Sequence, residues 1–85
     1  MSFIKNYRKL VKHFGSQQKT ADALGCSQPA VLKWLKGTAL MSSAFANRAQ
    51  AATNGKFKAI DLSPDIRDYQ LMIDKQSEVE NEING

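Results

Sequence analysis

The sequence contains one cysteine, Cys26, and one histidine, His13, among its 85 residues. One cysteine allows no disulfide within the chain, and a single thiol and a single imidazole are too few ligands for a zinc site. A catalytic centre needs a nucleophile with a base, paired carboxylates or clustered metal ligands, whereas residues 1–58 hold only one acid, Asp22. We therefore expect a protein that is not an enzyme and that uses neither a metal nor a cofactor.

Long apolar runs are also missing from the chain. No stretch approaches the roughly 18 to 20 residues needed to span a bilayer, and the N-terminal segment MSFIKNYRK lacks a hydrophobic signal core. We expect a cytoplasmic protein with no membrane partner. With 42% hydrophobic and 24% charged residues in an 85-residue chain, the composition is typical of one small globular domain.

Negative charge is scarce in the first two thirds of the chain. Residues 1–58 carry ten Lys or Arg residues against Asp22 alone, whereas the last 27 residues carry two basic and seven acidic residues. The net charge of +4 therefore hides a basic body followed by an acidic tail. A basic body favours a polyanionic partner through counterion release, although the same charges would also suit a merely solvated surface.

The apolar pattern predicts an all-α fold, a small bundle of four to five helices with a central helix-turn-helix. The first helix should run to about Phe14, and a fourth from Ser42 or Ser43 through about Ala52, whose small residues allow close packing. Asn54-Gly55 signals a turn, and a further short turn is expected around residues 59–62.

We divide the chain into a domain at residues 1–66 and an acidic C-terminal tail at residues 67–85. The tail contains residues spaced 3, 4, 3 and 4 apart, as in the seam of a helix that pairs with another helix: Tyr69, Met72, Gln76, Val79 and Ile83. Gln76 interrupts the apolar seam, and fewer than three heptads are present. The tail is therefore expected to be either helical, and available for a dimer contact, or partly disordered.

Residues 17–36, QQKTADALGCSQPAVLKWLK, read as two short amphipathic helices joined by a turn. Gly25 suits the bend because glycine takes a positive φ without steric penalty. Ser27 offers an N-cap hydroxyl to the second helix, and Pro29 lies in its first turn, where a missing N–H costs nothing. The expected buried stripe of this second helix consists of Ala30, Val31, Trp34 and Leu35, and its opposite face of Gln28, Lys33 and Lys36.

This arrangement resembles the helix-turn-helix of Cro and phage repressors. The matching positions are Gln17, Ala21, Gly25, Val31 and Trp34. Residues 52–65 are in turn similar to the end of YdaS-type and Cro-like prophage proteins, with an A-T-x-G-K turn followed by D-L-x-P-D. The resemblance covers about residues 7–66. It implies DNA binding through the helix-turn-helix and transcriptional repression, and for some relatives an antitoxin role.

If the second helix enters the major groove of B-DNA, its N-terminal residues face the base edges. The Gln28 amide then suits adenine N6 and N7, and the Lys33 ammonium suits guanine O6 or N7. The predicted base-contacting residues are Ser27, Gln28, Pro29 and Lys33, and the predicted backbone-contacting residues are Gln17, Gln18, Lys19 and Lys36. For each lysine the alternative is solvation, and for Gln28 it is a capping role.

The expected partners are a double-stranded DNA operator and a second copy of the chain, because one such domain buries little DNA surface. Three surfaces are candidates for the dimer contact, namely the fourth helix, the loop after Gly37 and the tail. For Arg48 the sequence favours neither of two roles, a contact with a DNA phosphate or a plain surface position. The alternative function is an antitoxin-type module whose main partner is another protein, docked on the basic face.

Overall fold

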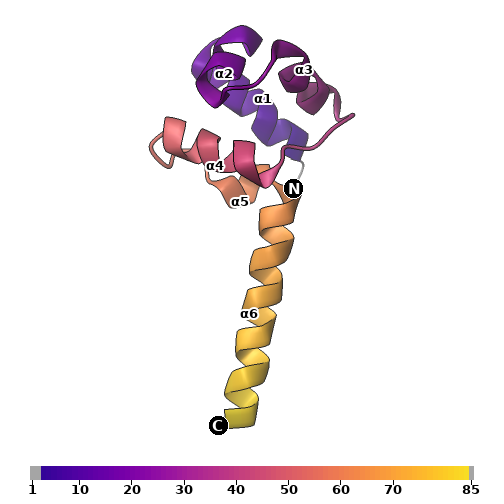
Figure 1. The fold of residues 1–85 in the computed structure, drawn as a ribbon, viewed down its shortest axis with the longest axis vertical. Helices are drawn as coiled ribbons and strands as arrows, with labels where there is room; N and C mark the ends of the chain where they lie inside the picture. Colours follow the sequence, from indigo (N-terminus) through magenta and orange to yellow (C-terminus); the bar gives the residue numbers. More distant parts are fainter. Residues whose placement is uncertain (1–2, 85) are drawn as a thin grey trace.

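The computed structural model describes residues 3–84, with side-chain surroundings described through Lys75. This part of the chain forms six helices and no strand: α1 (Phe3–Phe14), α2 (Gln17–Leu24), α3 (Gln28–Lys36), α4 (Ser43–Ala52), α5 (Ala59–Leu62) and α6 (Pro64–Asn84). Helices α1 to α5 pack into a body at one end of the molecule, and α6 leads away from it as one long helix (Figure 1). The predicted all-α fold with a central helix-turn-helix is confirmed.

The core of the body draws on all five of its helices and on the loop after α3. Its buried hydrophobic residues are Tyr7, Leu10, Ala21, Leu24, Val31, Trp34, Met41, Ala46, Ala49, Ala59 and Leu62. Aromatic contacts run through its centre, because the ring of Trp34 lies 6.2 Å from that of Tyr7 and 5.9 Å from that of Phe45. Buried residues of α1 therefore meet those of the predicted stripe of α3 in one core behind the helix-turn-helix.

Tyr7 joins three segments that are far apart in the sequence. Its hydroxyl donates to the carbonyl oxygen of Leu62 at 2.6 Å and accepts from the amide of Met41 at 3.0 Å. Both partners are backbone groups of buried residues. Leu62 is the last residue of α5 and Met41 lies in a loop, so the hydroxyl satisfies backbone groups where regular helix structure ends. The hydroxyl thus links α1 to α5 and to the loop between α3 and α4.

Helix α4 packs through its small residues, as its sequence predicts, except at its last position. Ala46 and Ala49 are fully buried, whereas Ala52 is exposed, so the expectation that Ala52 packs on the bundle is wrong. The reason is that α4 ends there and the chain turns through Asn54 and Gly55, both with positive φ. This is the turn expected at Asn54-Gly55. The further turn expected at residues 59–62 is a short helix, α5.

Helix α6 makes the molecule elongated. The radius of gyration is 15.1 Å, and the extents are 52 × 26 × 19 Å, whereas a compact domain of this length has a radius of gyration of about 12 Å. Of the two states considered for the tail, its backbone is helical through Asn84. The proposed boundary after residue 66 falls inside α6, about one turn past its start at Pro64.

Candidate nucleic-acid interface

Helix α2 is bounded by residues whose side chain or backbone satisfies its ends. Ser16 has an extended backbone, and its hydroxyl accepts from the amide of Lys19 at 3.1 Å. At the other end Gly25 adopts the left-handed conformation, with φ 71°, and its amide donates to the carbonyl of Ala21. Because that φ is unfavourable for most residues with a Cβ, glycine is strongly favoured where the chain turns toward α3.

Helix α3 begins after a turn of three residues, and the predicted caps are confirmed. The Ser27 hydroxyl accepts from the amide of Ala30 at 3.4 Å, and Pro29 lies in the first turn of the helix. Gly37 ends α3 in the left-handed conformation, with φ 76°. The two short helices are therefore fixed in length at both ends by local chemistry.

The two helices cross over small and apolar side chains. Ala21, Leu24 and Val31 have at most 1% of their surface exposed, and Ala21 has the short side chain that a close approach requires. Cys26 in the turn is half-buried against this core, and burial raises the pKa of its thiol while the positive charge of Arg48 opposes the rise. Cys26 thus acts as a small packing residue in the turn.

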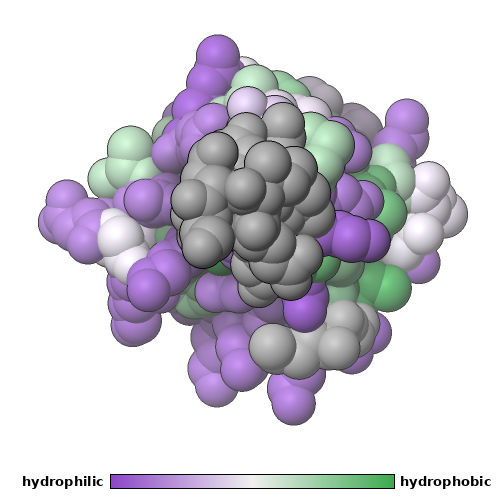
Figure 2. Space-filling model, turned by 90° about the horizontal axis from the view of Figure 1, so that it is seen from below, coloured by the Kyte–Doolittle hydropathy of each residue, from purple (hydrophilic) through white to green (hydrophobic). Residues whose placement is uncertain are grey.

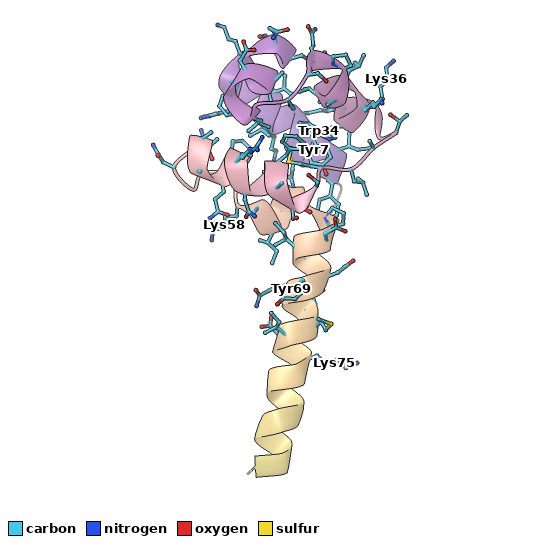
Figure 3. All side chains as sticks on the ribbon, viewed as in Figure 1. Tyr7, Trp34, Lys36, Lys58, Tyr69 and Lys75 are labelled. Atoms are coloured by element: carbon cyan, nitrogen blue, oxygen red, sulfur yellow. The ribbon has the colours of Figure 1, made fainter. Side chains whose placement is uncertain are left out.

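The outward face of α3 presents every residue that the sequence predicts to contact bases. Ser27, Gln28, Pro29 and Lys33 are all exposed. Lys36, a predicted backbone contact, is exposed at the C-terminal end of α3 and projects away from the buried pair Tyr7 and Trp34 (Figure 3). Helices α2 and α3 lie at the end of the molecule opposite the free end of α6 (Figure 1), so the tail does not cover this face.

The same face carries one residue that the sequence reasoning missed. Leu32 is 38% exposed and lies four residues after Gln28 and four before Lys36, on the same side of α3. The helical period could have identified it, because Leu32 falls opposite the stripe that contains Trp34. The residue type concealed it, since a leucine is ordinarily assigned to a core.

The start of α2 holds the remaining predicted contacts, in different states. Lys19 is exposed and Gln17 is half-buried. Gln18 is exposed, and its amide donates to a carboxylate oxygen of Asp22 at 2.9 Å, which leaves it one N–H and its carbonyl for another partner. The pairing was not anticipated, although Asp22 lies at the i+4 position at which such side chains meet.

Arg48 is exposed, in agreement with its prediction as a surface residue, and it also makes a contact that the sequence did not predict. From α4, one guanidinium nitrogen donates to the carbonyl of Leu24 at 3.1 Å, and the group lies over the ring of Phe45, 5.2 Å from the ring centre. The carbonyl of Leu24 is one of those that a helix C-terminus leaves without an intrahelical donor. Arg48 therefore ties α4 to the end of α2, next to the turn of the helix-turn-helix.

Comparison with known proteins assigns the chain to a family. Residues 7–71 match the model of the family described as Bacterial toxin YdaS, and the chain belongs to this family. The chain is also similar to the regulatory protein Cro of Pseudomonas phage D3, with 50% identity over 58 residues that cover 68% of this chain and 80% of the relative. No solved structure matches significantly. The resemblance to Cro-like, YdaS-type regulators is thus confirmed. Among the described residues, no helix has the length and apolarity to cross a membrane.

Proposed function

We propose that this member of the YdaS family is a sequence-specific double-stranded DNA-binding regulator of transcription, a Cro-like repressor that acts as a dimer. The observation that carries the proposal is the outward face of α3, where Gln28 and Lys33 are exposed on a helix whose other side is buried. The 50% identical relative named as a regulatory protein supports it. So does the excess of Lys and Arg in residues 1–58.

Direct readout in this proposal depends on the first half of α3. In the major groove, the Gln28 amide nitrogen donates to adenine N7 and the amide oxygen accepts from N6, in the bidentate arrangement that suits this base. Lys33 donates to guanine O6 or N7, one turn and a half along the helix. Ser27 contacts a base or a phosphate with its hydroxyl, and Pro29 offers an apolar contact.

Leu32 adds an apolar reader to this set. It is 38% exposed between two polar positions of the groove-facing side, and it belongs neither to the buried core nor to the partly buried hydrophobic residues packed against that core. In the major groove, the thymine methyl is the only apolar group that a base pair presents. We therefore assign Leu32 a contact with a thymine methyl in the base pairs next to the one read by Gln28.

Backbone contacts position the domain on the duplex. Lys19 and Lys36 are exposed cations near opposite ends of the two helices, and Gln17 and Gln18 lie where the first amides of α2 point outward. Each phosphate that a lysine neutralises adds about one unit to the slope of binding against salt. Gln18 can contribute only the N–H and the carbonyl that Asp22 leaves free.

Selection of bound duplexes from a random pool tests the proposal, and a two-fold symmetric consensus is the expected result. Against that consensus, Gln28→Ala should lose about 1–3 kcal/mol of discrimination at one base pair, whereas Lys19→Ala should weaken all sequences alike. Gln70→Ala on α6 is the matched control, because the same change is made to an exposed glutamine far from α3. Uniform loss across sequences for Gln28→Ala would overturn its assignment.

The second candidate is an antitoxin-type module whose main partner is a protein. The family description names a toxin and not an antitoxin, so it supports this candidate only weakly. Binding to random duplex DNA separates the two functions, because a DNA-binding domain has a salt-sensitive affinity for any duplex. A chain that binds no duplex even at low ionic strength would leave the protein-interaction module as the better account.

A further inference from the structure

We propose that α6 is the dimerisation helix of this protein and that it pairs in parallel with α6 of a second copy, along the face that contains Tyr69, Met72 and Ile73. The inference rests on the proposed function, because it names the surface through which the DNA-binding dimer forms. It concerns mainly residues beyond the family match, which ends at residue 71.

The exposed apolar residues of the described chain are concentrated on α6. Of its six exposed large hydrophobic residues, four lie within five positions of this helix: Tyr69 at 61%, Leu71 at 59%, Met72 at 56% and Ile73 at 38%. Figure 3 shows Tyr69 extending sideways from α6 below the body. Seen from the free end of α6, the part of the molecule visible around the grey atoms shows separate hydrophobic patches among hydrophilic side chains (Figure 2). A cluster of this kind on one segment marks an interaction surface.

Helix α6 also has no support from its own body over most of its length. Its first turns meet α4 and α5, and the remainder runs free of the other helices (Figure 1). An isolated helix is only marginally stable in water, and most helices in proteins are stabilised by burial of an apolar face. A helix that continues to Asn84 therefore calls for a partner along it.

The sequence indicates that this partner is another α6. From Tyr69 and Met72, the spacing of 3 and 4 continues through Gln76, Val79 and Ile83 in the part of α6 whose side chains are not described. A spacing of 3.5 residues keeps one face toward a second helix that has the same repeat. At the root of α6, a shallow cavity of about 300 Å³ lined by Ser43, Asp65, Ile66 and Tyr69 continues this face toward α4.

The charge pattern favours the parallel arrangement. In the register set by Tyr69 and Met72, Lys75 flanks the seam on one side, and Glu80 flanks it on the other side five residues later. In a parallel pair, such positions face each other across the two helices, and opposite charges there select the orientation. Each parallel dimer has two such Lys75 to Glu80 pairs, related by the two-fold axis.

The position of the helix-turn-helix leads to the same orientation. Helices α2 and α3 lie at the end of the molecule opposite the tip of α6 (Figure 1). A parallel pair places both bodies at one end, with the two-fold axis along α6, so both copies of α3 can face one duplex at half-sites about 34–36 Å apart. An antiparallel pair would place the bodies at opposite ends of an assembly longer than the 52 Å of one chain.

Sedimentation equilibrium of the full chain without DNA tests the surface. The wild-type chain should be a dimer, Met72→Glu should weaken the dimer at least about tenfold, and Leu71→Glu should leave it unchanged. These two variants make the same change at adjacent, equally exposed positions, but only Met72 lies in the seam. Gln76→Leu should tighten the dimer by completing the apolar repeat. A monomeric wild-type chain, or equal effects of Met72→Glu and Leu71→Glu, would overturn the proposal.

Oxidative cross-linking tests the orientation. In a chain that carries Cys26→Ser, the single cysteine of Val79→Cys should join the two copies in a parallel pair, whereas that of Leu71→Cys, off the seam, should not. Cross-linking only when Met72→Cys and Val79→Cys chains are mixed would indicate an antiparallel pair and contradict the proposal.

Salt then separates this inference from the proposed function. The dimer of this proposal depends mainly on apolar contacts of Tyr69, Met72 and Ile73, which salt does not screen, so added salt should leave the dimer constant nearly unchanged. DNA binding should instead weaken with salt. Specific DNA binding that persists in a Met72→Glu chain with a wild-type dimer constant would refute the α6 surface while leaving the proposed function intact.

Discussion

Removal of one hydroxyl, in Tyr7→Phe, should destabilise the domain more than truncation of an exposed side chain such as Gln28 on the outward face of α3. The phenol is 1% exposed and bonds to two backbone groups, the Leu62 carbonyl at 2.6 Å and the Met41 amide at 3.0 Å. The phenylalanine ring fills the same space, so no cavity forms and no apolar contact is lost. What remains is a buried donor and a buried acceptor without a partner.

The size of the effect follows from those two groups. A buried polar group left unsatisfied costs about 1–3 kcal/mol, and partial relaxation of the backbone brings the expected total to about 2–4 kcal/mol. A domain of this length typically has a stability of about 4–13 kcal/mol, so the loss is a large fraction of it. The melting temperature should fall by roughly 10–25 °C, measured by circular dichroism alongside urea unfolding.

Tyr69→Phe is the matched control, because it removes the same hydroxyl from a side chain that is 61% exposed. It should leave the free energy of unfolding unchanged. Equal stability of Tyr7→Phe and the wild-type chain would refute the assignment of the hydroxyl as a link between α1, α5 and the loop before α4.

The same residue predicts a dependence on alkaline pH. Burial raises the pKa of Tyr7 above 10.0, and the hydrogen bond from Met41 opposes part of that rise. Because the folded-state pKa is raised, the contribution of Tyr7 to stability is present below about pH 10 and is lost as the pH rises through the folded-state pKa. The difference in stability between the wild-type chain and Tyr7→Phe should therefore narrow above about pH 10.

Three further substitutions probe single features of the fold. Gly37→Ala should lower the free energy of unfolding by about 1–2 kcal/mol for a Cβ at φ 76°, and further because this Cβ would lie 2.7 Å from Ile4. Gly55→Ala, at φ 83° with open space around it, should lose only the backbone part in the same urea titrations. Ser63→Ala should leave stability unchanged or raise it, because the buried Ser63 hydroxyl has no hydrogen-bond partner in the described structure; a clear loss would contradict this. Arg48→Met should cost about 1 kcal/mol by releasing the carbonyl of Leu24, and it should raise the pKa of the Cys26 thiol, which ultraviolet titration of the thiolate measures.

The helix ends were predictable because one residue type answers one local requirement. Left-handed backbone at Gly25 and Gly37 needs glycine, and an orphan amide at the start of α3 needs a hydroxyl such as that of Ser27. The tether from Arg48 was not predictable, because its partner is a backbone carbonyl 24 residues away that only tertiary packing brings near. A backbone carbonyl has no residue-type signature, so no sequence pattern marks it.

In the candidate site, the helical period predicts which residues of α3 are exposed, whereas residue type is misleading at one position. Gln28 and Lys33 were identified because polar residues on one side of an amphipathic helix are expected to be exposed, and both are. Leu32 lies on that side too, but its residue type pointed to the core. The tail was left open between helix and disorder because a seam of fewer than three heptads, interrupted by Gln76, cannot decide the matter without a partner.

The side chains proposed to contact DNA differ from those whose hydrogen bonds stabilise the domain. The hydrogen bonds of Tyr7 link α1 to α5 and to the loop after α3, and that of Arg48 ties α4 to the end of α2, whereas the outward side chains Gln28 and Leu32 are exposed. Truncation of Gln28 to alanine, a good helix former, removes little buried surface and should leave the melting temperature unchanged, whereas Leu32→Ala also removes the covered part of a side chain that is 38% exposed. A change of base preference in Gln28→Ala or Leu32→Ala at constant melting temperature therefore reports a lost contact with DNA, and not a weakened fold.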